Sequence, residues 1–128
     1  MKKHITKLNN IAVKYNLYLF LSIIFAIFIL AGSITPEISI GKQGTSIKNS
    51  GFSTHFVSYF VLSSTILLFL SSKKIQKPFI KAALLAGSYG LFIELIQFFI
   101  TYRHFQILDI FTNFIGASLI FVFYLFKR

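Results

Sequence analysis

The residues of this sequence that could do chemistry are few, and they lie in or beside apolar stretches. Glu94 and Gln97 are three positions apart, which places both side chains on one face of a helix. Asp109, Asn113 and Gly116 follow at intervals of four and three, again along one helical face. Ionisable groups within apolar segments are costly, so these two faces predict a functional site.

A third polar face and one arginine complete the set. His55 and Tyr59 are four positions apart, and Arg103 stands between the two acidic stretches. The planar guanidinium group suits paired hydrogen bonds to a phosphate or a carboxylate. The ligand-binding residues that we expect are Arg103, Glu94, Gln97, Asp109, Asn113, His55 and Tyr59.

Three kinds of role are compatible with this set. A binding site would use Arg103 for an anionic group and the neighbouring side chains to orient it. An enzyme would use Glu94 and His55 as acid and base, with Asp109 as a further catalytic candidate, although no nucleophile stands in a recognisable motif. A purely structural network would join two helices through opposite charges. The sequence favours binding over catalysis and leaves the structural alternative open.

The sequence predicts no metal and no other cofactor. The chain has no cysteine, which excludes thiolate ligands and disulfides. His55, Glu94 and Asp109 could together ligate a metal, but their positions follow no fixed ligand spacing.

Membrane helices must position these residues. Hydrophobic residues make up 55% of the 128 positions and charged residues 12%, whereas a soluble domain carries about 25% charge. The apolar residues form long blocks, each near the roughly 17–25 residues that span a bilayer. We expect a single all-α membrane domain over 1–128. It is an up-and-down bundle of four transmembrane helices at about 17–34, 53–71, 79–100 and 106–126, with an extracytoplasmic loop at 35–52.

The net charge of +10 indicates topology rather than a nucleic-acid partner. Ten of the thirteen basic residues lie on one predicted side: Lys2, Lys3, Lys7, Lys14, Lys73, Lys74, Lys77, Lys81, Lys127 and Arg128. Lysine and arginine accumulate in cytoplasmic segments, so we expect both termini to be cytoplasmic in a multi-pass plasma-membrane protein. The polar residues would then gather near the outer surface, with Glu94 about 9 Å below the outer end of its helix.

The motif residues resemble a known family. Glu94-x-x-Gln97, Arg103, Asp109, Asn113 and Gly116, with His55-x-x-x-Tyr59 upstream, are similar to the pattern of the VanZ-like family over roughly residues 52–126. The resemblance implies a small bundle of membrane helices, in a family named for a protein linked to teicoplanin resistance. The chain departs from that pattern at 51–54, where the family usually has an Asp-Lys pair before the histidine.

The residues and the resemblance lead to one expected function. The protein would bind a polar or anionic headgroup at the outer leaflet of the cell envelope and contribute to glycopeptide resistance. Its expected partners are membrane lipid, a lipid-linked cell-wall precursor or the glycopeptide itself, without nucleic acid. The alternatives are an enzyme acting on a lipid-linked envelope substrate and a structural network, and the sequence leaves a homo-oligomer open.

Overall fold

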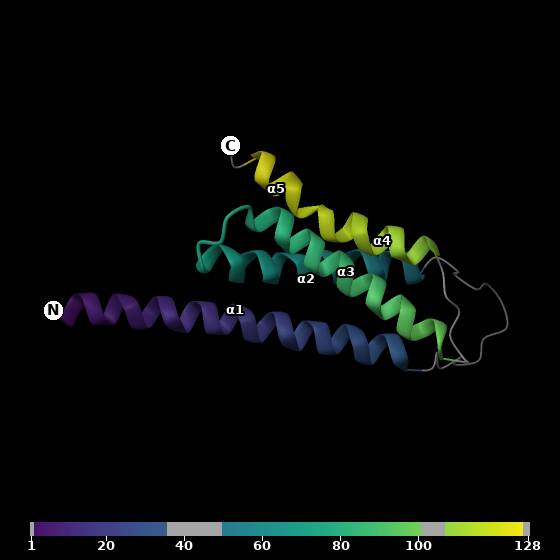
Figure 1. The fold of residues 1–128 in the computed structure, drawn as a ribbon, viewed down its shortest axis with the longest axis horizontal. Helices are drawn as coiled ribbons and strands as arrows, with labels where there is room; N and C mark the ends of the chain where they lie inside the picture. The colour runs from purple at the N-terminus through teal and green to yellow at the C-terminus, as the bar shows by residue number, and fades with distance from the viewer. Residues whose placement is uncertain (1, 36–49, 101–106, 127–128) are drawn as a thin grey trace.

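The computed structural model describes residues 2–35, 50–100 and 107–126. Within these ranges every regular element is a helix: α1 (Lys2–Ile34), α2 (Ser50–Ser72), α3 (Pro78–Phe98), α4 (Ile107–Ser118) and α5 (Ile120–Phe126). The helices alternate in direction. The end of α1, the start of α2, the end of α3 and the start of α4 lie together at one end of an elongated bundle (Figure 1). The expectation of an all-α protein is confirmed for the described residues.

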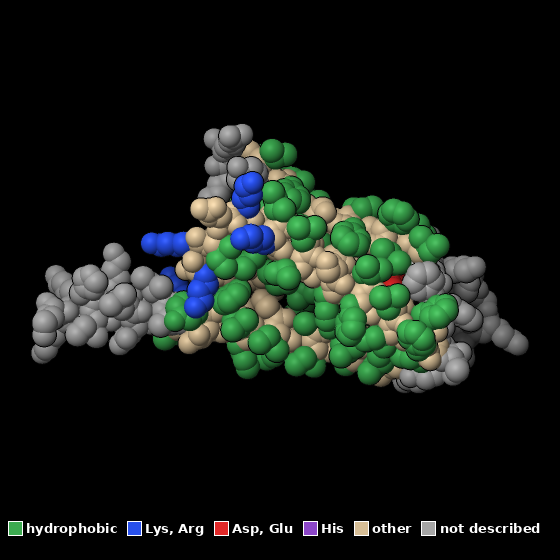
Figure 2. Space-filling model, viewed as in Figure 1, with side chains coloured by type: hydrophobic (Ala, Val, Ile, Leu, Met, Phe, Trp, Pro, Cys, Tyr) green, Lys and Arg blue, Asp and Glu red, His purple; other side chains and the backbone are tan. Residues whose placement is uncertain are grey.

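Among the described residues, three helices are long and apolar enough to cross a membrane. These spans are Val13–Ile34 within α1, Ser53–Ser72 in α2 and Pro78–Phe98 in α3. Large apolar side chains cover their outer faces, as the green surface in Figure 2 shows, and Phe28 is 70% exposed. A continuous apolar surface of this size is unfavourable in water. It suits the hydrocarbon region of a bilayer, where lipid tails contact such side chains.

The long helices extend differently from the expected spans. The first begins at Lys2, well before the expected start near 17, because the apolar block marks where a bilayer would lie and not where helical backbone begins. The third ends at Phe98, two residues earlier than expected. There the backbone amides of Phe99 and Ile100 bond to the carbonyls of Ile96 and Gln97, each at 3.0 Å. These i→i−3 bonds tighten and end the last turn.

The helix expected at 106–126 is divided at Leu119 into α4 and α5. The amide of Leu119 lies 3.1 Å from the carbonyl oxygen of Ile115 and 3.2 Å from that of Gly116, and the amide of Val122 bonds to Leu119 at 3.0 Å. This tighter pattern interrupts the α-helical ladder. Just before it, the Ser63 hydroxyl of α2 donates to the Ala117 carbonyl at 2.8 Å.

Small residues let the helices approach closely. The second helix packs against α1, α3 and α4. Along α3, Ala82, Ala86 and Gly90 are buried at four-residue spacing and lead to Glu94. Gly116 of α4 lies directly against the backbone carbonyl of Phe56, where a Cβ atom would overlap that oxygen. These contacts follow the small-residue packing typical of membrane helices, and the small residues of α3 face the interior of the bundle.

Side chains of α3 fasten α1 to the bundle. The Tyr89 hydroxyl donates to the Ala26 carbonyl at 2.6 Å, and the Gln97 amide donates to the Ser33 carbonyl at 3.0 Å. Each bond gives a buried or half-buried polar group a partner away from water, and together they fix how α1 lies along α3.

The two ends of the bundle differ in charge. The described lysines near the turn between α2 and α3 are Lys73, Lys74, Lys77 and Lys81. The blue side chains gather toward this end of the molecule in Figure 2, and the visible acidic atoms lie toward the other end. The described charges therefore separate along the bundle axis.

Candidate functional site

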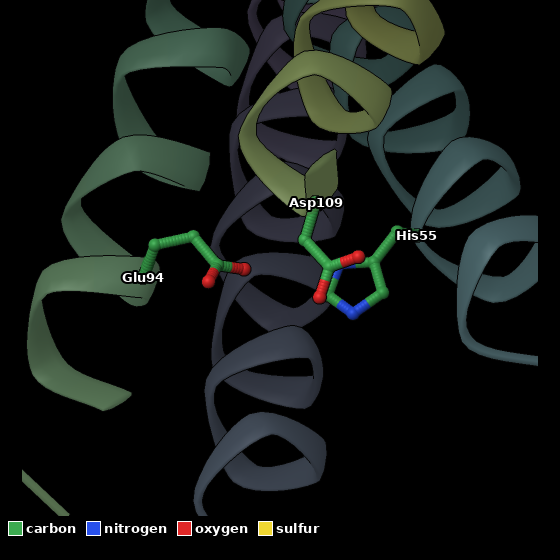
Figure 3. A group of neighbouring side chains, drawn as sticks. All are labelled: His55, Glu94 and Asp109. Carbon is green, nitrogen blue, oxygen red and sulfur yellow. The ribbon is translucent and has the colours of Figure 1, made fainter. Parts of the chain in front are cut away.

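Three different helices bring His55, Glu94 and Asp109 together at the end of the bundle away from those lysines. One potential ligand atom from each residue lies within 4.8 Å of the others. Figure 3 shows Glu94 reaching from α3, Asp109 from α4 and His55 from α2 toward a common point. We call these three residues the His–Glu–Asp cluster.

Helix ends explain why the cluster forms at this level. His55 lies in the second turn of α2, and Asp109 is the third residue of α4. Glu94 stands four residues before the end of α3, or about 6 Å at 1.5 Å per residue. This is closer to the end than the 9 Å expected from the sequence, because α3 ends earlier.

The environment of the cluster is unusual for charged groups. Glu94 is fully buried, whereas His55 and Asp109 are half-buried. Burying a carboxylate is costly unless its charge is compensated. A second carboxylate at this range adds repulsion, which a proton or a cation between the two would relieve. The cluster is therefore suited to hold positive charge or hydrogen-bond donors.

A buried amide orients the histidine. The Nδ1 atom of His55 lies 3.0 Å from Oδ1 of Asn113, and Asn113 is fully buried. When the amide oxygen accepts this bond, the proton is on Nδ1 and the lone pair is on Nε2. The contact thus sets both the direction of the ring and the nitrogen available to accept a proton or bind a cation.

Tyr59 completes the wall of the site. Its ring stacks on His55 with 6.4 Å between centroids and an interplanar angle of 11°. Its side chain is 1% exposed and near enough to Glu94 for the two to interact electrostatically. Within the described ranges, neither the Tyr59 hydroxyl nor Nδ2 of Asn113 has a hydrogen-bond partner. Two buried hydrogen-bond donors beside the cluster are therefore available to a ligand.

Gly90 provides the room for this arrangement. A Cβ atom at this position would lie 2.8 Å from Cβ of Asn113 and 3.0 Å from a ring carbon of Tyr59. The small residue therefore admits both side chains against α3. Gly90 is not among the site residues expected from the sequence, and the only sequence signal for a role at the site is its position four residues before Glu94.

Of the other expected ligand-binding residues, Gln97 bonds elsewhere, and Arg103 is not among the described residues. Gln97 is buried on the same face of α3 as Glu94, but its amide nitrogen donates to Ser33 of α1. Its visible role is to hold two helices together. Arg103 lies outside the described residues, so its proposed contact with an anionic group stays a prediction.

The sequence did not predict that these three potential metal ligands meet. His55, Glu94 and Asp109 come from three helices, and no spacing within one helix links them. The sequence did indicate that the three residues lie at a common level, because each is near the end of its apolar segment that is expected to face outward. The described geometry supplies two carboxylates and one imidazole, a donor set that can bind a cation, an ammonium group or a chain of hydroxyls.

Comparison with known proteins places the chain in a family. The family model described as VanZ/LLP1 matches residues 2–128, a wider range than the 52–126 covered by the motif resemblance. Neither a curated protein nor a solved structure gives a match to the chain. The match spans essentially the whole sequence, and the chain belongs to the VanZ/LLP1 family.

Proposed function

We propose that this VanZ/LLP1 protein binds a polar headgroup at the outer face of the plasma membrane and thereby contributes to glycopeptide (teicoplanin) resistance. The observation that carries the proposal is the convergence of His55, Glu94 and Asp109 beside the donors of Tyr59 and Asn113. Polar groups at this density inside a membrane bundle are costly, and a bound ligand would repay that cost.

The proposal includes a topology with four spans and both termini in the cytoplasm. The lysines around the turn between α2 and α3 support a cytoplasmic position for that end. Ile107–Phe126 covers 20 positions across α4 and α5, or about 30 Å of helix, the thickness of the hydrocarbon core. The His–Glu–Asp cluster would then face the outer surface.

The chemistry of the site narrows the type of headgroup. Two carboxylates and an imidazole favour a ligand with hydroxyl or ammonium donors, while Tyr59 and Asn113 can donate to its oxygens. Arg103, by its place in the sequence, would hold a phosphate or carboxylate of the same ligand. A lipid headgroup, a lipid-linked cell-wall precursor and the glycopeptide each combine such groups.

A resistance assay tests this function. Glu94→Gln, Asp109→Asn and Arg103→Ala should each lower teicoplanin resistance in cells that express the protein at wild-type levels. Thr112→Val is the matched control, because buried Thr112 bonds only within its own helix, to the Leu108 carbonyl at 2.8 Å. Resistance that survives all three site substitutions would rule the proposal out. If resistance falls only in step with thermal stability, the cluster is structural.

The proximity of His55 to Glu94 favours a second candidate, an enzyme acting on a lipid-linked envelope substrate. Ligand atoms of the two residues lie within 4.8 Å, close enough for one to pass a proton through a bound group to the other. Purified protein should then release phosphate or a cleaved group from such a substrate, and His55→Ala should stop the release. Binding of the substrate without turnover would exclude the enzyme and leave headgroup binding as the remaining candidate.

A further inference from the structure

We propose that His55, Glu94 and Asp109 bind one divalent transition-metal cation, such as Zn²⁺. The inference goes beyond headgroup binding and does not depend on it, because the three ligands come from the chain itself. It also revises the expectation from sequence spacing that no metal is bound.

The geometry of the cluster is close to that of a coordination sphere. A tetrahedral zinc with bonds of about 2.1 Å holds its ligands about 3.4 Å apart. The three candidate atoms all lie within 4.8 Å of one another, so metal binding requires the side chains to bring these atoms somewhat closer together. Three protein ligands leave a fourth position for water or an oxygen of a bound molecule.

Charge balance supports a dication in particular. Glu94 is fully buried and Asp109 is half-buried at close range. A divalent cation neutralises two carboxylates at once, which removes both their repulsion and the cost of holding their charge in an apolar bundle.

The side chains of Asn113 and Tyr59 around the cluster also support metal binding. A histidine that binds a metal almost always donates its other ring N–H to an oxygen. Asn113 offers such an oxygen 3.0 Å from Nδ1 of His55, which leaves Nε2 with its lone pair. In the described part of the chain, the buried hydroxyl of Tyr59 and Nδ2 of Asn113 lack partners. Both can donate to a water or oxygen held on the metal.

The donor set selects the class of metal. One imidazole with two carboxylates suits zinc, manganese or iron. Magnesium prefers oxygen ligands and keeps several of its waters, which suits a site with an imidazole ligand and a buried carboxylate less well. The site should therefore prefer Zn²⁺ over Mg²⁺.

Titration of the full-length protein with Zn²⁺ alone tests the site. The protein is purified in a non-ionic detergent with its affinity tag removed, stripped with a chelator, and titrated calorimetrically with Zn²⁺ and then with Mg²⁺. We expect one Zn²⁺ per chain. His55→Ala, Glu94→Gln and Asp109→Asn should each weaken binding by more than about 10-fold, and Asn113→Leu, which leaves all three ligands in place, by about 10–100-fold.

Matched controls separate the cluster from other sources of binding. His4→Ala removes a histidine that is not one of the three ligands, and Thr112→Val removes a buried hydroxyl of α4. Both variants should bind Zn²⁺ as the wild type does. Circular dichroism and size-exclusion chromatography identify variants that misfold. If a ligand variant misfolds, the weaker Zn²⁺ binding of Asn113→Leu tests the site in its place. Zn²⁺ binding that survives His55→Ala, is lost in His4→Ala or is equalled by Mg²⁺ would overturn the proposal. The titration contains no headgroup or glycopeptide, so a negative result leaves headgroup binding to its own test.

Discussion

Nδ1 of His55 lies 3.0 Å from Oδ1 of Asn113, so a hydrogen bond between two side chains joins α2 to α4 at the level of the acidic residues. Four residues further along α2, Tyr59 stacks on the same imidazole. The histidine is therefore held from two sides, by an amide on one helix and by an aromatic ring on its own. Such support fixes a functional side chain more firmly than any one contact does.

Replacing Asn113 should affect function more than stability. Asn113→Leu removes the bond to His55 while keeping a side chain of similar size. Hydrogen bonds between membrane helices contribute about 0.6 kcal/mol on average, so we expect only a small loss of unfolding free energy in detergent. Teicoplanin resistance should nevertheless fall, because the imidazole loses its orientation. A large loss of stability with proportionate loss of resistance would show that the amide serves packing alone.

Three glycines should respond to alanine in a graded way. Gly116→Ala places a methyl group on the backbone carbonyl of Phe56, which cannot rotate away, whereas Gly87→Ala meets only the ring of Phe114. Gly32 has nothing within 4 Å of the added methyl. We expect Gly116→Ala to lower the unfolding free energy by about 1–3 kcal/mol, Gly87→Ala to lower it less, and Gly32→Ala not to lower it.

Unfolding in a mixed-detergent titration measures this series. Alanine is a better helix former than glycine, so Gly32→Ala should be neutral or stabilising. Gly116→Ala should also lower resistance, since it separates the two helices that carry His55 and Asn113. Equal stability of the Gly116 and Gly32 variants would contradict the close contact of α2 with α4.

Much of the fold could be predicted because hydropathy and charge act over long blocks. The apolar stretches located each helix of the described residues to within its ends. The start of α1 at Lys2 could not be found this way, since a helix continues into polar sequence without any apolar signal. The break at Leu119 could not be predicted either, because the hydrogen-bond pattern changes there while the sequence stays apolar.

The residues of the candidate site could be named from the sequence, but the contacts between them could not. The polar residues on the apolar segments identified His55, Glu94, Asp109 and Asn113 as a group. Which of them meet depends on how three helices pack, and that packing is set by glycines such as Gly90 whose partners are far away in sequence. Gln97 illustrates the limit, since its spacing assigned it to the site and its amide bonds to α1.

The attachment of α1 should depend on two polar bonds. Tyr89→Phe removes the donor to the Ala26 carbonyl, and Gln97→Leu removes the donor to the Ser33 carbonyl. Each should lower the unfolding free energy by about 0.6 kcal/mol. The two residues are eight positions apart on α3, or about 12 Å, so the losses should add in the double variant. Ser64→Ala, which removes a bond only within α2, is the control and should leave α1 attached. Unchanged stability in the double variant would mean that apolar packing alone holds α1.

Cysteine labelling should establish the orientation of the bundle. The chain has no cysteine, so each introduced thiol reports its own position. Thr35 and Gln76 are exposed at opposite ends of the bundle, and Phe126 at the end of α5 is 87% exposed. In intact cells, a maleimide that cannot cross the membrane should label Thr35→Cys and not Gln76→Cys or Phe126→Cys. After permeabilisation all three should react, with the cysteine-free parent as the unlabelled control.

Labelling of Gln76→Cys in intact cells would show the opposite orientation of the bundle. Labelling of Phe126→Cys there, with Gln76→Cys protected, would mean that α4 and α5 do not form a fourth span.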